Sequence, residues 1–277
     1  MSTIFNTNTE TLFAAYTREG YVFKQVAELL NNNIKTAYFT IDADTIKLRM
    51  MDSHANVLID LCMFSENFLV YKCDSKKPLN VGLNLSHFYK MLRNTKKKDS
   101  IILFIEKGQE DNLGIQIIPK ENNRISTSYI KIQNTQNLNI DLPTGYGRPV
   151  NVSAADYQKT CKDMGNISST IKIISKGFKI TLSGDAGAVY SREVVFGTEI
   201  VNTKEYKNKE YEGTFDTEKL IKITKLSGLT SNIKIYGTKS LPLLFKGSIG
   251  SLGDLSIYIK SREDLEKEKE NYDSDDE

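Results

Sequence analysis

Lysine and arginine side chains recur three residues apart in several separate segments of the chain. The repeated positions are Lys90, Arg93, Lys159, Lys162, Lys219, Lys222 and Lys225. Side chains spaced in this way lie on the same side of an α-helix. Ammonium and guanidinium groups gathered there bind the phosphates of a nucleic acid without reading its bases. Each pair taken singly is also typical of a solvated helix face, so the prediction of a phosphate-binding surface depends on the repetition.

Four short amphipathic helices are predicted to position these side chains, over residues 20–30, 85–94, 153–164 and 216–226. Apolar residues recur in them at the i, i+3/i+4 and i+7 spacing of a core-facing stripe. Their starts are 65, 68 and 63 residues apart, and alternating strand–turn–strand patterns follow each one. This spacing indicates one supersecondary unit used four times, although coincidence remains the alternative. Lys24, on the first helix, is partly offset by Glu28.

Two units make a half, so the chain is predicted to have an α+β fold with two similar domains, each with two helices on antiparallel sheets. The predicted parts are an N-terminal extension (1–11), a first domain (12–133), a connector (134–150), a second domain (151–262) and an acidic disordered tail (263–277). The connector contains several prolines and glycines, which interrupt both helical and strand patterns. The tail has almost no apolar residues with which to form a core.

Charge is distributed unevenly along the chain. The net charge is +2, and residues 263–277 contribute −7 to it, which leaves +9 on the other 262 residues. A basic body fits a polyanionic partner, although the same charge also serves ordinary solubility. Few aromatic residues share the basic helix faces, which favours duplex DNA over single strands. No signal peptide or membrane span is apparent, so we expect a soluble intracellular protein that does not bind membranes.

Motifs for catalysis are missing from the sequence. It contains no phosphate-binding glycine-rich loop, no dinucleotide-binding glycine motif and no zinc-protease motif. His54 and His87 do not have the spacing of metal ligands, and the three cysteines form no CxxC pair. We therefore expect no catalytic residues, no metal and no cofactor. Because catalytic carboxylates can be scattered, a DNA-modifying enzyme stays open as a less favoured alternative.

Several segments resemble one known family in a consistent order. LRMMDSHANVLIDLCM (48–63), FLVYKCD (68–74) and the stretch 81–104 are similar to the first half of the proliferating cell nuclear antigen, the sliding clamp of eukaryotes and archaea. NVSAADYQKTCKDMGNISSTIKI (151–173) and LPLLFKGSIGSLGDLSIYIKSRED (241–264) resemble its second half. The resemblance covers most of residues 12–264.

The resemblance implies a non-enzymatic DNA sliding clamp: a ring of three identical subunits that surrounds duplex DNA, with helices lining the hole. A clamp loader and DNA polymerase are the implied partners. The residues implied to face DNA are Lys24, Lys90, Arg93, Lys159, Lys162 and Lys225, and helical spacing adds Lys222. The implied joining strands lie near 113–118 and 188–196.

The family also holds its partners in an apolar pocket beside the connector. The matching positions are Met51, Leu58, Ile140, Leu142, Pro143, Pro242 and Tyr258. Without the resemblance, these residues would be taken as ordinary core. Lys260, Glu263 and the altered GYGRP stretch depart from the family near the pocket rim, which leaves the partner preference open. Residues 201–213 also look inserted or reshaped.

Two functions remain as alternatives within the same fold: a checkpoint-type clamp subunit and a viral processivity factor that forms no ring. A sliding clamp is expected in the nucleus or, alternatively, at a viral replication site in a host cell.

Overall fold

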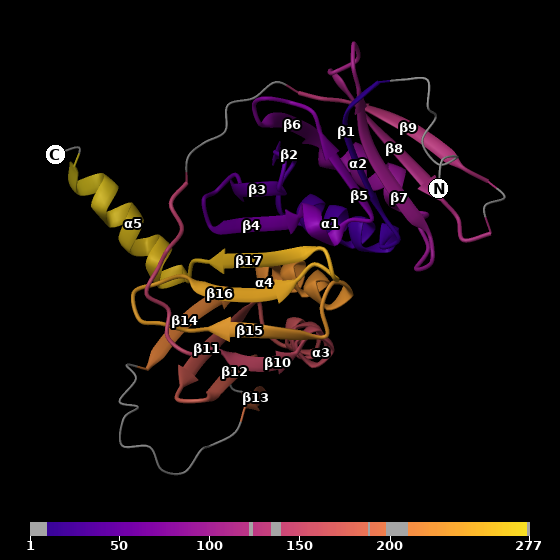
Figure 1. Cartoon of the computed structure of the whole chain (residues 1–277). Coiled ribbons are helices and arrows are strands. Elements are labelled where there is room, and N and C mark those ends of the chain that lie inside the picture. Colours follow the sequence, from indigo (N-terminus) through magenta and orange to yellow (C-terminus); the bar gives the residue numbers. More distant parts are fainter. Residues whose placement is uncertain (1–9, 122–123, 134–139, 188, 198–209, 276–277) are drawn as a thin grey trace. The chain divides into compact units, whose positions relative to one another are not determined.

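A computed structural model describes residues 10–121, 124–133, 140–187, 189–197 and 210–275 (Figure 1). Most of the predicted N-terminal extension, part of the connector, Ala188 and most of the predicted insertion lie outside these residues. The chain forms two compact units. The first comprises residues 1–50, 60–140 and 248–255, and the second comprises residues 51–59, 141–247 and 256–277.

Antiparallel sheets and two helices build the first unit. Its elements, in chain order, are β1 (Thr11–Thr17), α1 (Gly20–Asn33), β2 (Thr36–Ile41), β3 (Thr45–Met51), β4 (Val57–Phe64), β5 (Val70–Cys73), β6 (Leu79–Asn84), α2 (Leu85–Leu92), β7 (Ser100–Glu106), β8 (Asn112–Ile118) and β9 (Ser126–Lys131), with a 3-10 turn η1 (Ser65–Asn67) after β4. One sheet has the order β5-β1-β7-β8-β9, and β2 pairs with both β3 and β6 elsewhere in the unit.

The periodicity of the sequence explains these elements. In α1 the buried residues include Phe23, Val26 and Leu30, which form one stripe along the helix. In β2 every second residue is buried, as a strand with one core-facing side requires. Helix α2 begins after Asn84, whose side chain accepts a hydrogen bond from the backbone N–H of His87 at 3.1 Å. α1 and α2 pack against each other.

The second unit has a similar order of elements in the residues that the structure describes, with four strands instead of five between its first two helices and an additional helix at its end. These are β10 (Val150–Ser153), α3 (Ala154–Gly165), β11 (Thr170–Lys176), β12 (Lys179–Asp185), β13 (Ser191–Gly197), β14 (Tyr211–Asp216), α4 (Thr217–Ile223), β15 (Asn232–Tyr236), β16 (Leu243–Ser248), β17 (Gly253–Ile259) and α5 (Arg262–Asp275), with a 3-10 turn η2 (Thr224–Gly228) after α4. One sheet has the order β13-β12-β11-β14, and β15 pairs with β10 and β16. α3 packs on α4 and η2.

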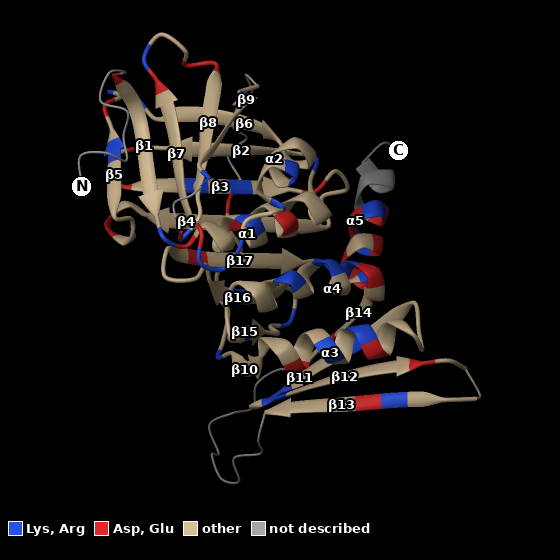
Figure 2. Ribbon diagram, turned by 90° about the vertical axis from the view of Figure 1, so that its right-hand side faces the viewer, with Lys and Arg blue, Asp and Glu red and all other residues tan. Residues whose placement is uncertain are grey.

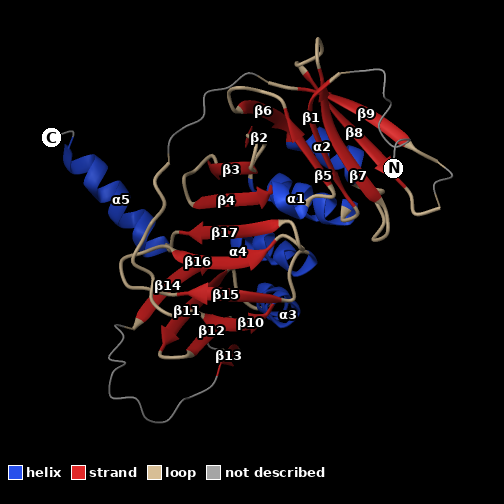
Figure 3. Cartoon of the chain, in the orientation of Figure 1, coloured by secondary structure: helices blue, strands red, loops and turns tan. Residues whose placement is uncertain are grey.

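The predicted α+β fold is therefore confirmed, with helices α1 to α4 each beginning within one residue of its predicted start. All strand pairs described within the units are antiparallel, and Figure 3 shows the helices in blue and the strands in red in both units. Ser153 is the N-cap of α3, because its Oγ accepts a hydrogen bond from the Asp156 N–H at 3.4 Å.

The C-terminal tail differs from the prediction. Disorder was expected over 263–277, but residues Arg262–Asp275 form α5. The helix begins with a capping box: Ser261 Oγ accepts from the Asp264 N–H at 3.1 Å, and the Asp264 carboxylate accepts from the Ser261 N–H at 3.3 Å. The Ser261 hydroxyl also donates to that carboxylate at 2.8 Å. Glu263 and Asp264 in the first turn favour the helix N-terminus, where partial positive charge gathers. The prediction of disorder rested on the composition of the tail, which does not reveal these local contacts.

The predicted joining strand in the first unit is also corrected. Residues 113–118 belong to β8, which pairs with β7 on one side and β9 on the other. Its backbone N–H and C=O groups are therefore used within the sheet. β9 is the edge strand instead, and β13 is the edge strand of the four-stranded sheet in the second unit. An edge strand leaves one row of backbone groups available for another chain.

The capping box predicts how α5 responds to substitution. Ser261→Ala removes both side-chain hydrogen bonds and should weaken the first turn by about 1 kcal/mol. Hydrogen–deuterium exchange of the α5 amides should then speed up roughly fivefold, while exchange in α3 is unchanged. Ser261→Thr keeps the hydroxyl and serves as the control. Exchange of the wild-type α5 amides at the rate of an unstructured peptide would show that the tail is disordered after all.

Candidate nucleic-acid and partner interfaces

The first unit places Lys90 and Arg93 on the exposed side of α2. Leu85, Phe88 and Leu92 occupy the buried side of the same helix. Lys24 on α1 is half-buried, and its ammonium group lies 5.3 Å from the centroid of the Tyr21 ring. This cation–π contact holds the lysine close to the helix. Because α1 packs against α2, the first unit brings all three predicted basic residues onto one helical layer.

The second unit places Lys159 and Lys162 on the exposed side of α3. Neither lysine forms an ion pair with a residue that the structure describes, so their charges are not neutralised in this part of the chain. The buried side of α3 carries Tyr157, Cys161 and Met164, as the sequence pattern predicted. Lys and Arg residues mark α2 and α3 in blue in Figure 2.

The basic residues of the fourth repeat are in a different electrostatic state. Lys222 on α4 lies 2.8 Å from the Glu218 carboxylate, and both Lys222 and Lys225 are half-buried. Lys219 is 3.1 Å from Asp216. Lys225 falls in the 3-10 turn η2, not in α4. The net positive charge of this element is therefore smaller than its lysine count suggests, which the sequence spacing did not show.

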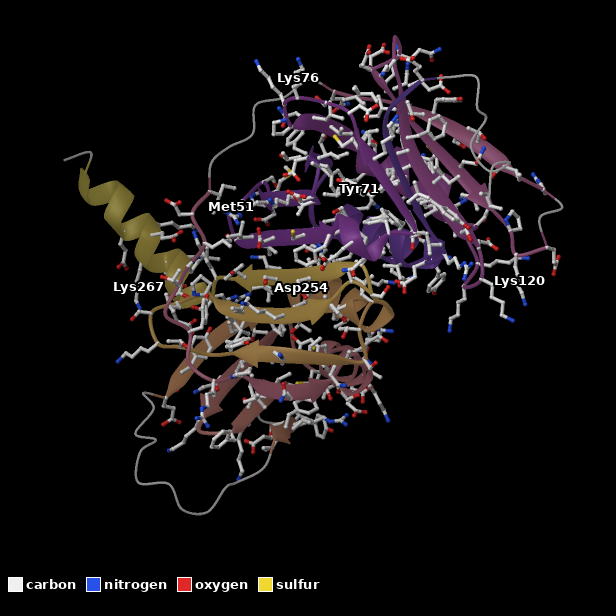
Figure 4. The ribbon with its side chains drawn as sticks, in the orientation of Figure 1. Met51, Tyr71, Lys76, Lys120, Asp254 and Lys267 are labelled. Carbon is white, nitrogen blue, oxygen red and sulfur yellow. The ribbon has the colours of Figure 1, made fainter. Side chains whose placement is uncertain are left out.

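A basic cavity of about 760 Å³ adds residues outside the predicted DNA-facing set. Lys96, Lys97 and Lys98, which follow α2, line it together with Lys120 and Arg124 from the connection between β8 and β9. Asp99 and Glu121 also line the cavity, so its lining has a net charge of +3. Lys120 is labelled in Figure 4. More than twenty residues separate the two basic groups along the chain, so only the fold brings them together.

Most of the predicted partner-binding residues lie in segments assigned to the second unit, which include residues 51–59 at the end of β3 and the start of β4. Leu58 and Tyr258 are buried there, at 6% and 5% exposure, whereas Met51 is 37% exposed. Leu142, Pro143 and Pro242 are half-buried. Ile140 ends the 60–140 segment of the first unit, where its carbonyl accepts a hydrogen bond from Arg49 at 3.0 Å.

Tyr146, in the GYGRP stretch, was not predicted to take part but lies among these residues. Its hydroxyl donates to the Pro242 carbonyl at 2.9 Å, and its ring centroid is 6.0 Å from that of Tyr258. It is also 6.0 Å from Tyr236. Burial, with a smaller effect of Tyr258, raises the pKa of Tyr146, so its hydroxyl stays protonated as a donor. The feature of the sequence that could have indicated a role for Tyr146 is its position as an aromatic residue between two glycines.

The structure offers little for redox or metal chemistry in the residues that it describes. No group of three or more His, Cys, Asp and Glu side chains there is arranged to hold a metal ion. Cys62, Cys73 and Cys161 are free thiols, and burial raises the pKa of Cys161 to about 12. Within the same described residues, the helices are too short or too polar to cross a membrane.

Comparison with known proteins gives one family over nearly the whole chain. Residues 12–141 match the proliferating cell nuclear antigen N-terminal domain, and residues 143–262 match its C-terminal domain. A probable DNA polymerase sliding clamp 1 of Paramecium bursaria Chlorella virus 1 is 26% identical over 253 residues, which cover 90% of this chain and 96% of the relative. A probable DNA polymerase sliding clamp of Autographa californica nuclear polyhedrosis virus is 25% identical over 253 residues, covering 90% and 95%.

The hydrogen bond of Tyr146 can be tested directly. Tyr146→Phe keeps the ring but removes the donor to the Pro242 carbonyl. We expect the free energy of unfolding to fall by about 1 kcal/mol in urea denaturation. Tyr190→Phe is the control, because Tyr190 is 53% exposed. Equal stability of the two variants would mean that Tyr146 does not anchor the connector.

Proposed function

The chain belongs to the proliferating cell nuclear antigen family, and from this premise we propose that it is a DNA sliding clamp, which closes into a ring around duplex DNA and tethers a DNA polymerase to it. The observation that carries this proposal is the match of both family domains, in order, to a chain with exposed lysines and an arginine on repeated helices. A checkpoint-type subunit and a factor that forms no ring remain the alternatives. A DNA-modifying enzyme is less favoured, and we expect no turnover of DNA by the pure protein.

Weak, sequence-independent attraction to DNA suits such a clamp. The proposed contacts are Lys24, Lys90, Arg93, Lys159, Lys162, Lys222 and Lys225. Long basic side chains on exposed helix faces attract phosphates but do not recognise bases, so the protein can move along the duplex. The protein would stay on the DNA because a closed ring surrounds the duplex. The Glu218 ion pair reduces the contribution of Lys222, so we assign the larger share to α2 and α3.

Edge strands support the proposed closure into a homotrimer. β9 and β13 each leave a row of backbone groups that their own sheets do not use. Both also expose apolar side chains: Tyr129 on β9 is 52% exposed and Val195 on β13 is 47% exposed. Pairing β9 of one subunit with β13 of the next is a head-to-tail contact, which forms a ring when the rotation closes. The number three comes from the family resemblance.

Partners would bind at the apolar residues beside the connector. Met51 is exposed, and Leu142, Pro143 and Pro242 are half-buried, so apolar surface remains to receive an inserted side chain. The Tyr146 ring adds to this surface. We propose a DNA polymerase and a clamp loader as partners. Tethering raises the effective concentration of the polymerase at the primer end, which is the physical basis of processivity.

The proposed location in the cell follows from the DNA that the protein would bind. A protein that holds a polymerase on duplex DNA works where DNA is replicated. We therefore propose the nucleus or, since both relatives named above are viral, a viral replication site in a host cell.

Reversal of the helix charges tests the DNA contact. Lys90→Glu, Arg93→Glu, Lys159→Glu and Lys162→Glu combined should abolish stimulation of a polymerase on primed circular DNA, since repulsion replaces attraction to the phosphates. The control carries Lys→Glu at Lys76, Lys77, Lys234 and Lys246, which are exposed away from α1 to α4 and give the same change in net charge. Oligomer mass and melting temperature should match in both variants. Full stimulation by the helix variant would exclude the proposed DNA-facing surface.

A charge on the β13 edge tests ring closure. Val195→Glu should turn a trimer into monomers of 31.3 kDa in light scattering, because an unpaired carboxylate would be buried at the joint. Leu69→Glu is the control, as Leu69 is 53% exposed beside β5 at the other end of the first unit's five-stranded sheet. A wild-type protein that is monomeric at micromolar concentration would favour the factor without a ring.

A further inference from the structure

Met51 is the last residue of β3, and its side chain reaches solvent. Along this strand Ile46 and Leu48 face the core, whereas Lys47 and Arg49 are exposed. Met51 is 37% exposed and is labelled in Figure 4. A thioether in this position is open to small solutes in the surrounding water, so its chemistry does not depend on an opening of the fold.

The other methionines of the described residues are better protected. Met63 and Met164 lie in the core, at 1% and 0% exposure. Met50 is half-buried, and its sulfur accepts a hydrogen bond from a backbone N–H of β2 at 3.2 Å. Met91 on α2 is half-buried too. Met51 is therefore the most exposed methionine in the part of the chain that the structure describes.

The cysteine thiols compete weakly with Met51 for an oxidant. The thiolate is the reactive form of cysteine, whereas a thioether needs no deprotonation. Burial raises the pKa of the Cys62 thiol, and it raises that of Cys161 to about 12, so both stay protonated at neutral pH. Cys73 is half-buried at the end of β5, outside the proposed partner surface.

Met51 belongs to the apolar residues that the proposed clamp would use to hold its partners. Its segment, residues 51–59, is assigned to the same compact unit as Leu142, Pro143 and Pro242. An unbranched, polarisable side chain adapts well to an inserted apolar group. A partner that binds there would cover the Met51 thioether and take it out of water.

We propose that Met51 is a site of reversible oxidation that weakens partner binding, an inference that rests on the proposed partner surface. Hydrogen peroxide transfers one oxygen atom to the sulfur: an S–O bond forms, the O–O bond breaks, the sulfur loses two electrons and the peroxide leaves as water. The sulfoxide oxygen is a polar acceptor, and an apolar partner would cover it without a hydrogen bond. A methionine sulfoxide reductase with a dithiol returns the thioether, and the oxygen leaves as water while the dithiol becomes a disulfide.

Peroxide treatment of the folded protein tests the selectivity. Trypsin cleavage after Arg49 and Lys72 releases one peptide that contains Met50, Met51 and Met63. Fragmentation of this peptide in a mass spectrometer assigns each added oxygen to one of the three residues. We expect Met51 to be oxidised at least roughly tenfold faster than Met63 in the folded protein, and at the same rate in concentrated urea, because exposure controls the rate. Equal rates for the two residues in the folded protein would overturn the proposal.

A polymerase assay tests the effect on partners. The probe is a DNA polymerase on primed circular DNA, and catalase removes the peroxide before the polymerase is added. Oxidation should raise the clamp concentration needed for half-maximal stimulation about tenfold, because the sulfoxide oxygen loses its water on binding. Reductase with dithiothreitol should restore the original concentration, and the melting temperature should stay the same throughout. Unaltered stimulation by protein that is fully oxidised at Met51 would refute the proposed effect on partners.

Two leucine variants separate Met51 from the other oxidisable groups. Met51→Leu and Met91→Leu each keep an apolar side chain of similar volume but remove one sulfur. Each variant is compared with its own untreated state, so a change in basal stimulation does not enter the comparison. Peroxide should leave the half-maximal concentration of Met51→Leu unchanged and should raise that of Met91→Leu as in the wild type. The same rise in Met51→Leu would assign the effect to another group and contradict the proposal.

Failure of this inference is distinguishable from failure of the clamp function. The order of oxidation of Met50, Met51 and Met63 is measured without DNA or a partner. Untreated protein that does not stimulate any polymerase would count against the clamp function, whereas stimulation that persists after oxidation of Met51 would count against the inference alone.

Discussion

Burial of one stripe of each amphipathic helix is the constraint on which the rest depends. Phe88 and Leu92 must face the core, because leaving them in water would cost each about 1.5–3 kcal/mol. Once that stripe is buried, the helical period places Lys90 and Arg93 on the opposite, solvent-facing side. The same argument applies to α3, where burial of Tyr157 and Cys161 directs Lys159 and Lys162 outward. The packed core and the exposed basic surface are thus two consequences of one helical period.

Unused backbone groups are the second constraint, and they act at the ends of the sheets. A five-stranded sheet that ends at β9 and a four-stranded sheet that ends at β13 each keep one row of amides and carbonyls for an outside partner. The exposed Tyr129 and Val195 side chains give these edges apolar surface that another chain could cover. In the proposed ring, strand pairing at these edges would be directional yet limited in area.

Local contacts order the connector and the C-terminal helix. Tyr146 ties the connector to Pro242 through one hydrogen bond, and it packs on Tyr258. At the C-terminus, Ser261 and Asp264 cap a helix that lies past the matched domain, which ends at residue 262.

The sequence by itself determined the α+β class, the fourfold repeat and the outward direction of the basic stripes on α2 and α3, because hydrophobic periodicity and helix geometry are local properties. It also indicated the family, through segments that keep their order along the chain. Only the tertiary structure decided that β8 is an interior strand and β9 an edge, since strand order depends on pairing between distant segments. It alone showed that Lys222 is paired with Glu218 and that Lys120 and Arg124 join Lys96 to Lys98. Side-chain partners across space have no signature in spacing, because they arise from elements that meet only after folding.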